Sequence, residues 1–143
     1  DRLPRLWFAA TLVGMVAALN SILVSHYDMF DHLDEHIITA MLAFGGGVLW
    51  AVLSVPALGR HATAAGQRMR KIGASMAAVG FVVMLAAFNP VANSIDATNL
   101  TTKEFLNEAQ EAVVIAAPAE YILVAGLMVC LASYRHELQS KSE

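Results

Sequence analysis

The chain has 143 residues, of which 57% are hydrophobic and only 15% are charged, and its formal net charge at pH 7 is −3. Charged residues make up about a quarter of a typical soluble domain, so this composition excludes an ordinary water-soluble protein. The length suits one domain. We therefore expect residues 1–143 to form a single domain embedded in the lipid bilayer.

Four long apolar segments follow one another along the chain. They cover approximately residues 6–24, 37–58, 72–88 and 113–134. A helix of about twenty residues crosses a hydrocarbon core of about 30 Å, and lipid requires each spanning segment to satisfy its own backbone hydrogen bonds. The sequence therefore predicts an all-α fold, an integral membrane bundle of four transmembrane helices. We expect Pro56 and Gly59 to end the second helix, and Asn89 with Pro90 to end the third.

Basic residues predict the orientation of these helices. Eight of the nine lie near the chain start, between the second and third segments, or near the chain end: Arg2, Arg5, Arg60, Arg68, Arg70, Lys71, Arg135 and Lys141. Lys and Arg in short loops stay on the cytoplasmic side, so we expect both termini there, in a bacterial inner membrane or an organellar membrane. Because the basic loop has no interleaved aromatic residues, lipid headgroups explain it better than nucleic acid does.

The two segments on the other side are acidic. One is the short stretch 26–36, HYDMFDHLDEH, and the other is the longer loop 91–111. Within the longer loop, Thr101 followed by Glu104 fits a capping box, which predicts a short amphipathic helix on the outer side before the fourth span. An acidic outer face can also attract a basic soluble partner.

The stretch 26–36 contains a candidate metal site. Asp28, His32 and His36 are four residues apart, so a helix would place them in one row. Imidazole and carboxylate ligands suit copper, zinc or iron. Further carboxylate ligands can come from Glu35, Glu108 and Glu111. The alternative is a plain acidic surface at the membrane boundary.

Polar residues inside the predicted spans are the second candidate site. Glu120 lies well inside the fourth apolar segment and Asn20 inside the first. A carboxylate at such a depth is costly and is by default a functional hypothesis: a proton relay, an ion ligand, or a contact with another helix or subunit. None of the five histidines lies within a span, so we do not expect an intramembrane haem with two histidine ligands.

Small residues predict close approaches between the helices. Pairs four residues apart are Gly14 with Ala18, Ala43 with Gly47, and Gly73 with Ala77. The run of three glycines at 45–47 weakens helix propensity by about 1 kcal/mol per residue relative to alanine. A close neighbour, a cofactor ring or a bend would each explain this run.

No catalytic constellation is complete in the sequence, so we do not expect an enzyme. Our interpretation is a small non-catalytic integral subunit that packs against larger partners in a membrane complex, such as one of energy conversion, or against further copies of itself. Two alternatives stay open. One is a metal- or cofactor-dependent redox protein that uses the outer Asp, His and Glu residues, and the other is a small oligomeric transporter or channel that uses Glu120.

Overall fold

The computed structural model describes residues 3–29, 31–94 and 101–139. Within these residues the four long helices are α1 (Leu3–His26), α2 (Leu33–Ala57), α3 (Ala64–Ser94) and α5 (Gln110–Gln139). A 3-10 turn, η1 (Gly59–His61), lies between α2 and α3, and the short helix α4 (Thr102–Glu108) directly precedes α5. Each long helix is long and apolar enough to cross a membrane. The predicted all-α integral membrane bundle is confirmed.

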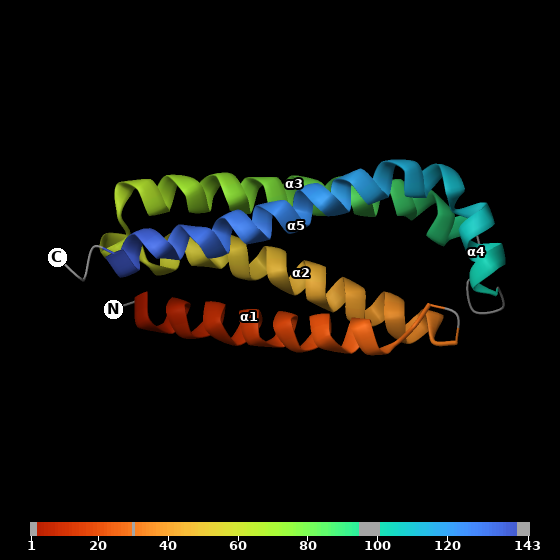
Figure 1. Cartoon of the computed structure of the whole chain (residues 1–143), viewed down its shortest axis with the longest axis horizontal. Coiled ribbons are helices and arrows are strands. Elements are labelled where there is room, and N and C mark those ends of the chain that lie inside the picture. Colours follow the sequence, from red (N-terminus) through yellow and green to blue (C-terminus); the bar gives the residue numbers. More distant parts are fainter. Residues whose placement is uncertain (1–2, 30, 95–100, 140–143) are drawn as a thin grey trace.

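The four long helices run side by side as two pairs (Figure 1). Helix α1 packs along α2, α3 packs along α5, and α2 joins the two pairs. The start of α1, the end of α5 and the connection from α2 to α3 lie at one end of the bundle, which we call the terminal end. The turn between α1 and α2 lies at the opposite end together with α4, and we call this the α4 end.

Helices α3 and α5 approach each other so closely that their backbones touch. A Cβ atom on Gly73 would lie 2.6 Å from the Gly126 carbonyl oxygen, and one on Gly126 would lie 2.5 Å from the Ala77 nitrogen. Farther along, a Cβ on Gly80 would lie 2.6 Å from the Ala119 carbonyl oxygen. Small residues allow such contacts where no hydrophobic effect drives helices together, as the Gly73 and Ala77 spacing predicted.

The three consecutive glycines of α2 each admit a different neighbour. A Cβ on Gly45 would lie 3.3 Å from the ring of Phe81 in α3, and one on Gly46 would lie 3.1 Å from the Cβ of Ala17 in α1. On Gly47 it would lie 2.9 Å from a methyl group of Leu127 in α5. Successive residues of a helix point about 100° apart, so one turn of α2 contacts all three other long helices. A close neighbour therefore explains all three positions.

The helices extend farther than the predicted apolar segments. Pro90 does not end the third helix, because α3 continues to Ser94 with the proline inside it. Helix α2 ends at Ala57, between Pro56 and Gly59 as predicted, with Pro56 in its last turn. Spanning helices tolerate proline because neighbouring groups satisfy the freed carbonyls. Helix α3 also begins eight residues before the predicted segment, since the Thr63 hydroxyl accepts a hydrogen bond from the Gly66 N–H at 3.1 Å and starts the helix there.

Helix α4 begins with the capping box that the sequence predicted. The Thr101 hydroxyl accepts from the Glu104 N–H, and the Glu104 carboxylate accepts from the Thr101 N–H at 2.9 Å. This backbone hydrogen bond, and then the one from the Thr101 hydroxyl, hold the pKa of the exposed Glu104 carboxyl below its usual value. The amphipathic character and the outer-side position of α4 remain predictions.

Candidate functional site

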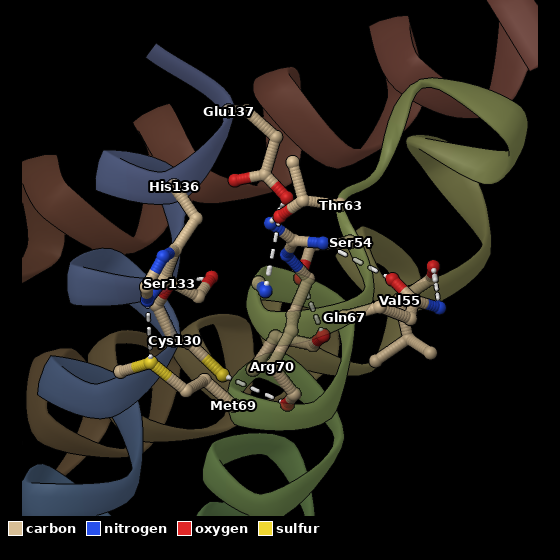
Figure 2. A network of polar contacts seen from close by, with 12 residues as sticks. Ser54, Val55, Thr63, Gln67, Met69, Arg70, Cys130, Ser133, His136 and Glu137 are labelled. Atoms are coloured by element: carbon tan, nitrogen blue, oxygen red, sulfur yellow. Dashed lines mark hydrogen bonds and ion pairs between the residues drawn. The ribbon is translucent and has the colours of Figure 1, made fainter. Parts of the chain in front are cut away.

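A network of polar side chains lies at the terminal end, where α2, α3 and α5 meet (Figure 2). At its centre is Arg70 of α3, whose side chain is fully buried and whose Nη2 lies 3.0 Å from Oε1 of Glu137 in α5. Its Nη1 donates to Oε1 of Gln67 at 3.1 Å. The Gln67 Nε2 in turn donates to the Val55 carbonyl near the end of α2 at 3.0 Å. This chain of contacts ties three helices together.

Aromatic rings extend the network to the fourth long helix. The guanidinium carbon of Arg70 lies 4.7 Å from the centre of the Tyr134 ring, a distance at which a cation is attracted to the face of the ring. Trp50 of α2 stacks with Tyr134 at a centroid distance of 6.3 Å, and Trp7 of α1 meets the same ring edge-on at 6.4 Å. All four long helices therefore contribute to this end of the bundle.

Smaller contacts surround the ion pair. The Cys130 thiol donates to the Arg70 carbonyl at 3.5 Å, and the Ser133 hydroxyl donates to the Cys130 carbonyl at 2.6 Å. A Cβ at Gly66 would collide with the Glu137 carboxylate, so this glycine makes room for the buried acid. Because Arg70 has no exposed surface, no substrate can reach its guanidinium. The geometry is that of a structural clamp.

The predicted metal ligands are spread over several elements at the α4 end. The His32 N–H donates to the Asp28 carbonyl at 3.1 Å and the His36 N–H to the His32 carbonyl at 2.9 Å, but α2 begins only at Leu33, so Asp28 lies in the turn before the helix. There, the Asp28 carboxylate accepts from the Asp31 N–H at 2.9 Å. Exposed carboxylates are found in the first turn of α2, at the end of α4 and at the start of α5: Glu35, Glu108 and Glu111.

These residues do not form a cluster of ligands. Within the described parts of the chain, no group of three or more His, Cys, Asp or Glu side chains is arranged to hold a metal ion. His32 precedes the first residue of α2 without a side-chain capping bond, and its ring lies edge-on to Tyr27. The structure therefore gives the metal site no support, and that site stays a prediction.

His36 is held by a backbone carbonyl. Its Nδ1 lies 2.7 Å from the Tyr27 carbonyl oxygen at the end of α1. A carbonyl oxygen can only accept, so Nδ1 must carry the hydrogen. In the neutral ring, the other nitrogen, Nε2, is consequently a hydrogen-bond acceptor.

Glu120 lies on the surface of the bundle, although it is inside a spanning helix. It is the eleventh residue of α5 and is exposed, whereas Ala119 before it is buried. Leu127, seven residues later on the same side of α5, contacts α2 at Gly47. Glu120 therefore lies on the flank of α5 next to α2, and it interacts electrostatically with His36 across this seam. The sequence predicted these two residues as parts of separate candidate sites.

Comparison with protein families gives one match. Residues 1–141 match the family model described as the Frag1/DRAM/Sfk1/Cwh43P N-terminal domain. The chain belongs to this family. No curated protein and no solved structure compared with the chain matches it. Membership in the Frag1 family agrees with the four spanning helices, and the protein is an integral membrane protein of the lipid bilayer.

Asn20, the other polar residue predicted inside a span of this Frag1-family chain, is satisfied locally. Its side chain is buried, and its Nδ2 donates to the Val16 carbonyl of the same helix at 2.9 Å. A hydrogen bond to the preceding turn removes the cost of an unpaired amide in lipid. Among the polar residues predicted inside the spans, Glu120 therefore stands apart by its exposure.

The clamp was not predicted, because Arg70 lies in a basic stretch typical of a loop and no pattern gave Glu137 a role. A signal was present in both helices. Arg70 follows Gly66 by four residues and precedes Gly73 by three, so it shares the stripe of small residues that faces α5. Glu137 lies four residues after Ser133 on the buried stripe of α5. A charge on a small-residue stripe indicates a buried pair.

Proposed function

We propose that this chain is a small non-catalytic subunit of a membrane complex and that its α2–α5 seam, the surface around Glu120 and His36, binds a protein partner within the bilayer. The observation that carries the proposal is the exposure of Glu120 inside a spanning helix. An acidic residue within a spanning helix is costly, up to about 3 kcal/mol at the helix centre on insertion scales, and such residues almost always face protein or water. A partner on the seam supplies that protein environment.

Two further observations support a binding role over a catalytic one. The buried polar network around Arg70 has no access for a substrate. A shallow hollow of about 430 Å³ between α1 and α2 is lined only by apolar side chains and glycine: Leu12, Val13, Val16, Met41, Leu42, Gly45, Gly46 and Leu49. Catalytic pockets need a few convergent polar groups, and this lining has none.

A second candidate function rests on the pairing of Glu120 with His36. Two ionisable groups on neighbouring helices that interact electrostatically can each serve as a step of a proton path, which fits the small oligomeric transporter. Purified protein in vesicles would then carry a proton or cation flux that Glu120→Gln abolishes. Flux that is absent from the wild type, or unchanged in the variant, would eliminate this function.

Cysteine crosslinking in the membranes where the chain is naturally made tests the proposed subunit role. Val124 lies one turn after Glu120 on the seam and is half-buried, whereas Val114 is 70% exposed on another side of α5. We expect Val124→Cys to crosslink into a larger complex and Val114→Cys to remain monomeric. Cys130 is buried and stays in place.

The double variant Val124→Cys with Glu120→Gln tests whether the crosslink depends on the Glu120 carboxylate. The crosslinked product should fall several-fold, because the polar contact to the partner is lost. Equal products from the two cysteine positions, or a yield that does not depend on Glu120, would contradict the proposed role.

A further inference from the structure

We infer that the partner on the α2–α5 seam is a transmembrane helix with a single Lys or Arg side chain at the depth of Glu120. This inference rests on the proposed function, since it assumes that the seam binds a protein within the bilayer. It adds the chemistry of the contact, a carboxylate on this chain against a fixed positive charge on the partner.

The position of Glu120 along α5 decides between sources of positive charge. Ten residues separate it from Gln110 at the start of the helix, which is about 15 Å at 1.5 Å per residue. Even from the predicted start of the span at residue 113, it is about 10 Å deep. Lipid ammonium groups and soluble basic proteins lie at the membrane surface, whereas a Lys or Arg on a spanning helix can lie at the level of Glu120 itself, so we assign the charge to a spanning helix.

His36 does not complement the carboxylate in its neutral form. Its Nδ1 hydrogen is already donated to the Tyr27 carbonyl, so the nitrogen that remains, Nε2, is an acceptor. An acceptor repels the oxygens of a carboxylate. In that form, His36 leaves the acidic side chain of Glu120 to an external donor, whereas a protonated His36 attracts the carboxylate from within the same chain.

The described helices of a second copy of this chain do not provide the charge either. In the described helices, the Lys and Arg residues of α1, α3 and α5 lie near the terminal end: Arg5, Arg68, Arg70, Lys71 and Arg135. Lys103 lies on α4, outside the spans. Copies in the same membrane share one orientation, so a symmetric contact through the seam would place two Glu120 side chains together. Charge complementarity therefore favours a different protein.

The surface beside Glu120 allows another helix to come close. Ala117, one turn before it, is small, and Val124, one turn after it, is short; both are half-buried. Small residues beside a polar group are typical of helix contacts in membranes. A Lys or Arg side chain on an adjacent helix is long enough to reach a carboxylate across such a contact.

Synthetic spanning peptides test the charge directly. The full chain is reconstituted in phosphatidylcholine vesicles with a labelled Leu/Ala helix that carries one Lys a third of the way along, and energy transfer reports association. The control peptide has Leu at that position. We expect the Lys peptide to bind the wild type about tenfold more tightly than the Leu peptide, within the range of interhelical polar contacts.

Three variants test whether the preference for the Lys peptide depends on the Glu120 carboxylate. Glu120→Gln should abolish the preference for the Lys peptide, whereas Glu111→Gln, which removes an exposed carboxylate at the head of α5, should keep it. His36→Gln should also keep it. Equal binding of both peptides by the wild type, or a preference that survives Glu120→Gln, would overturn the inference. Binding of a peptide with Asn in place of Lys as tightly as the Lys peptide would also overturn the inference, because a neutral hydrogen-bond donor would then suffice.

The outcomes separate this inference from the proposed function. If Val124→Cys crosslinks to a partner but the chain shows no preference for the Lys peptide, the inferred positive charge on the partner is wrong and the subunit role stands. A clear Lys preference without any crosslink at Val124→Cys overturns the subunit role and leaves the recognition of a cation by Glu120 intact.

Discussion

Two carboxylates on the same helix, Glu137 and Glu120, meet opposite surroundings. The Glu137 side chain is only 10% exposed and pairs with Arg70 inside the bundle. Glu120 lies seventeen residues earlier, on the outer surface of the seam between α5 and α2. The stripe of the helix on which each residue lies, more than its chemistry, decides whether the acid stabilises the fold or is left for a contact outside it.

The two ends of the bundle differ in the same way. At the terminal end, an ion pair, a glutamine and three aromatic rings connect all four long helices. At the α4 end, α3 and α5 keep an apolar core of Met84, Ala116 and Ala119 with Phe44 and Phe81 packed against it. Glu120 follows Ala119 of this core and faces the seam. We therefore expect charge changes at the terminal end to alter stability, and charge changes at Glu120 to alter association.

The largest effect is expected from Arg70→Ala. Removing one partner of a buried ion pair leaves the other charge uncompensated, which costs about 3–5 kcal/mol. The free energy of unfolding, measured by denaturant titration in detergent micelles, should fall by that amount. Arg68→Ala is the matched control, because Arg68 is exposed on the same helix. Equal losses in the two variants would show that the pair does not clamp the helices.

The next effect is a steric one at Gly66. Alanine there would collide with the Glu137 carboxylate, and overpacking typically costs about 1–3 kcal/mol, which exceeds the gain of about 1 kcal/mol in helix propensity. We expect a net loss of stability in the same titration. Gly45→Ala serves as the comparison, because its Cβ would meet only the Phe81 ring, at 3.3 Å, and should be nearly neutral. Equal stability of Gly66→Ala and wild type would refute the close fit.

A smaller effect concerns Glu104, a carboxylate outside the spans. Its pKa in the folded state is lowered by the Thr101 hydrogen bonds, so its contribution is present above its unfolded pKa and is lost as the pH falls through its folded pKa. Amide exchange in α4 should therefore quicken in acid relative to neutral pH, after correction for intrinsic rates. Thr101→Ala should remove about 1 kcal/mol of local stability and most of this pH dependence. A pH dependence that is the same in Thr101→Ala would contradict the capping box as its cause.

The features that could be predicted from the sequence are those that depend on a single segment of the chain. Apolar length predicted the four spanning helices, and Thr101 with Glu104 predicted the start of α4, because both signals are local. Arg70 was missed because a charge next to an apolar segment resembles a membrane-facing loop residue, and only the register of α3 against α5 buries it. Likewise, the depth of Glu120 could be predicted, but its exposed side and its neighbour His36 depend on how α2 and α5 pack.

The most direct test compares Glu120→Gln with Glu137→Gln by two measurements on each protein: the free energy of unfolding in detergent and the Val124→Cys crosslink in native membranes. We predict that Glu120→Gln keeps the wild-type stability and loses the crosslink several-fold. Glu137→Gln should lose stability, because Arg70 is then buried without a counter-charge. A Glu120→Gln protein that unfolds more easily while keeping its crosslink would contradict the central claim that this carboxylate serves a partner and not the fold.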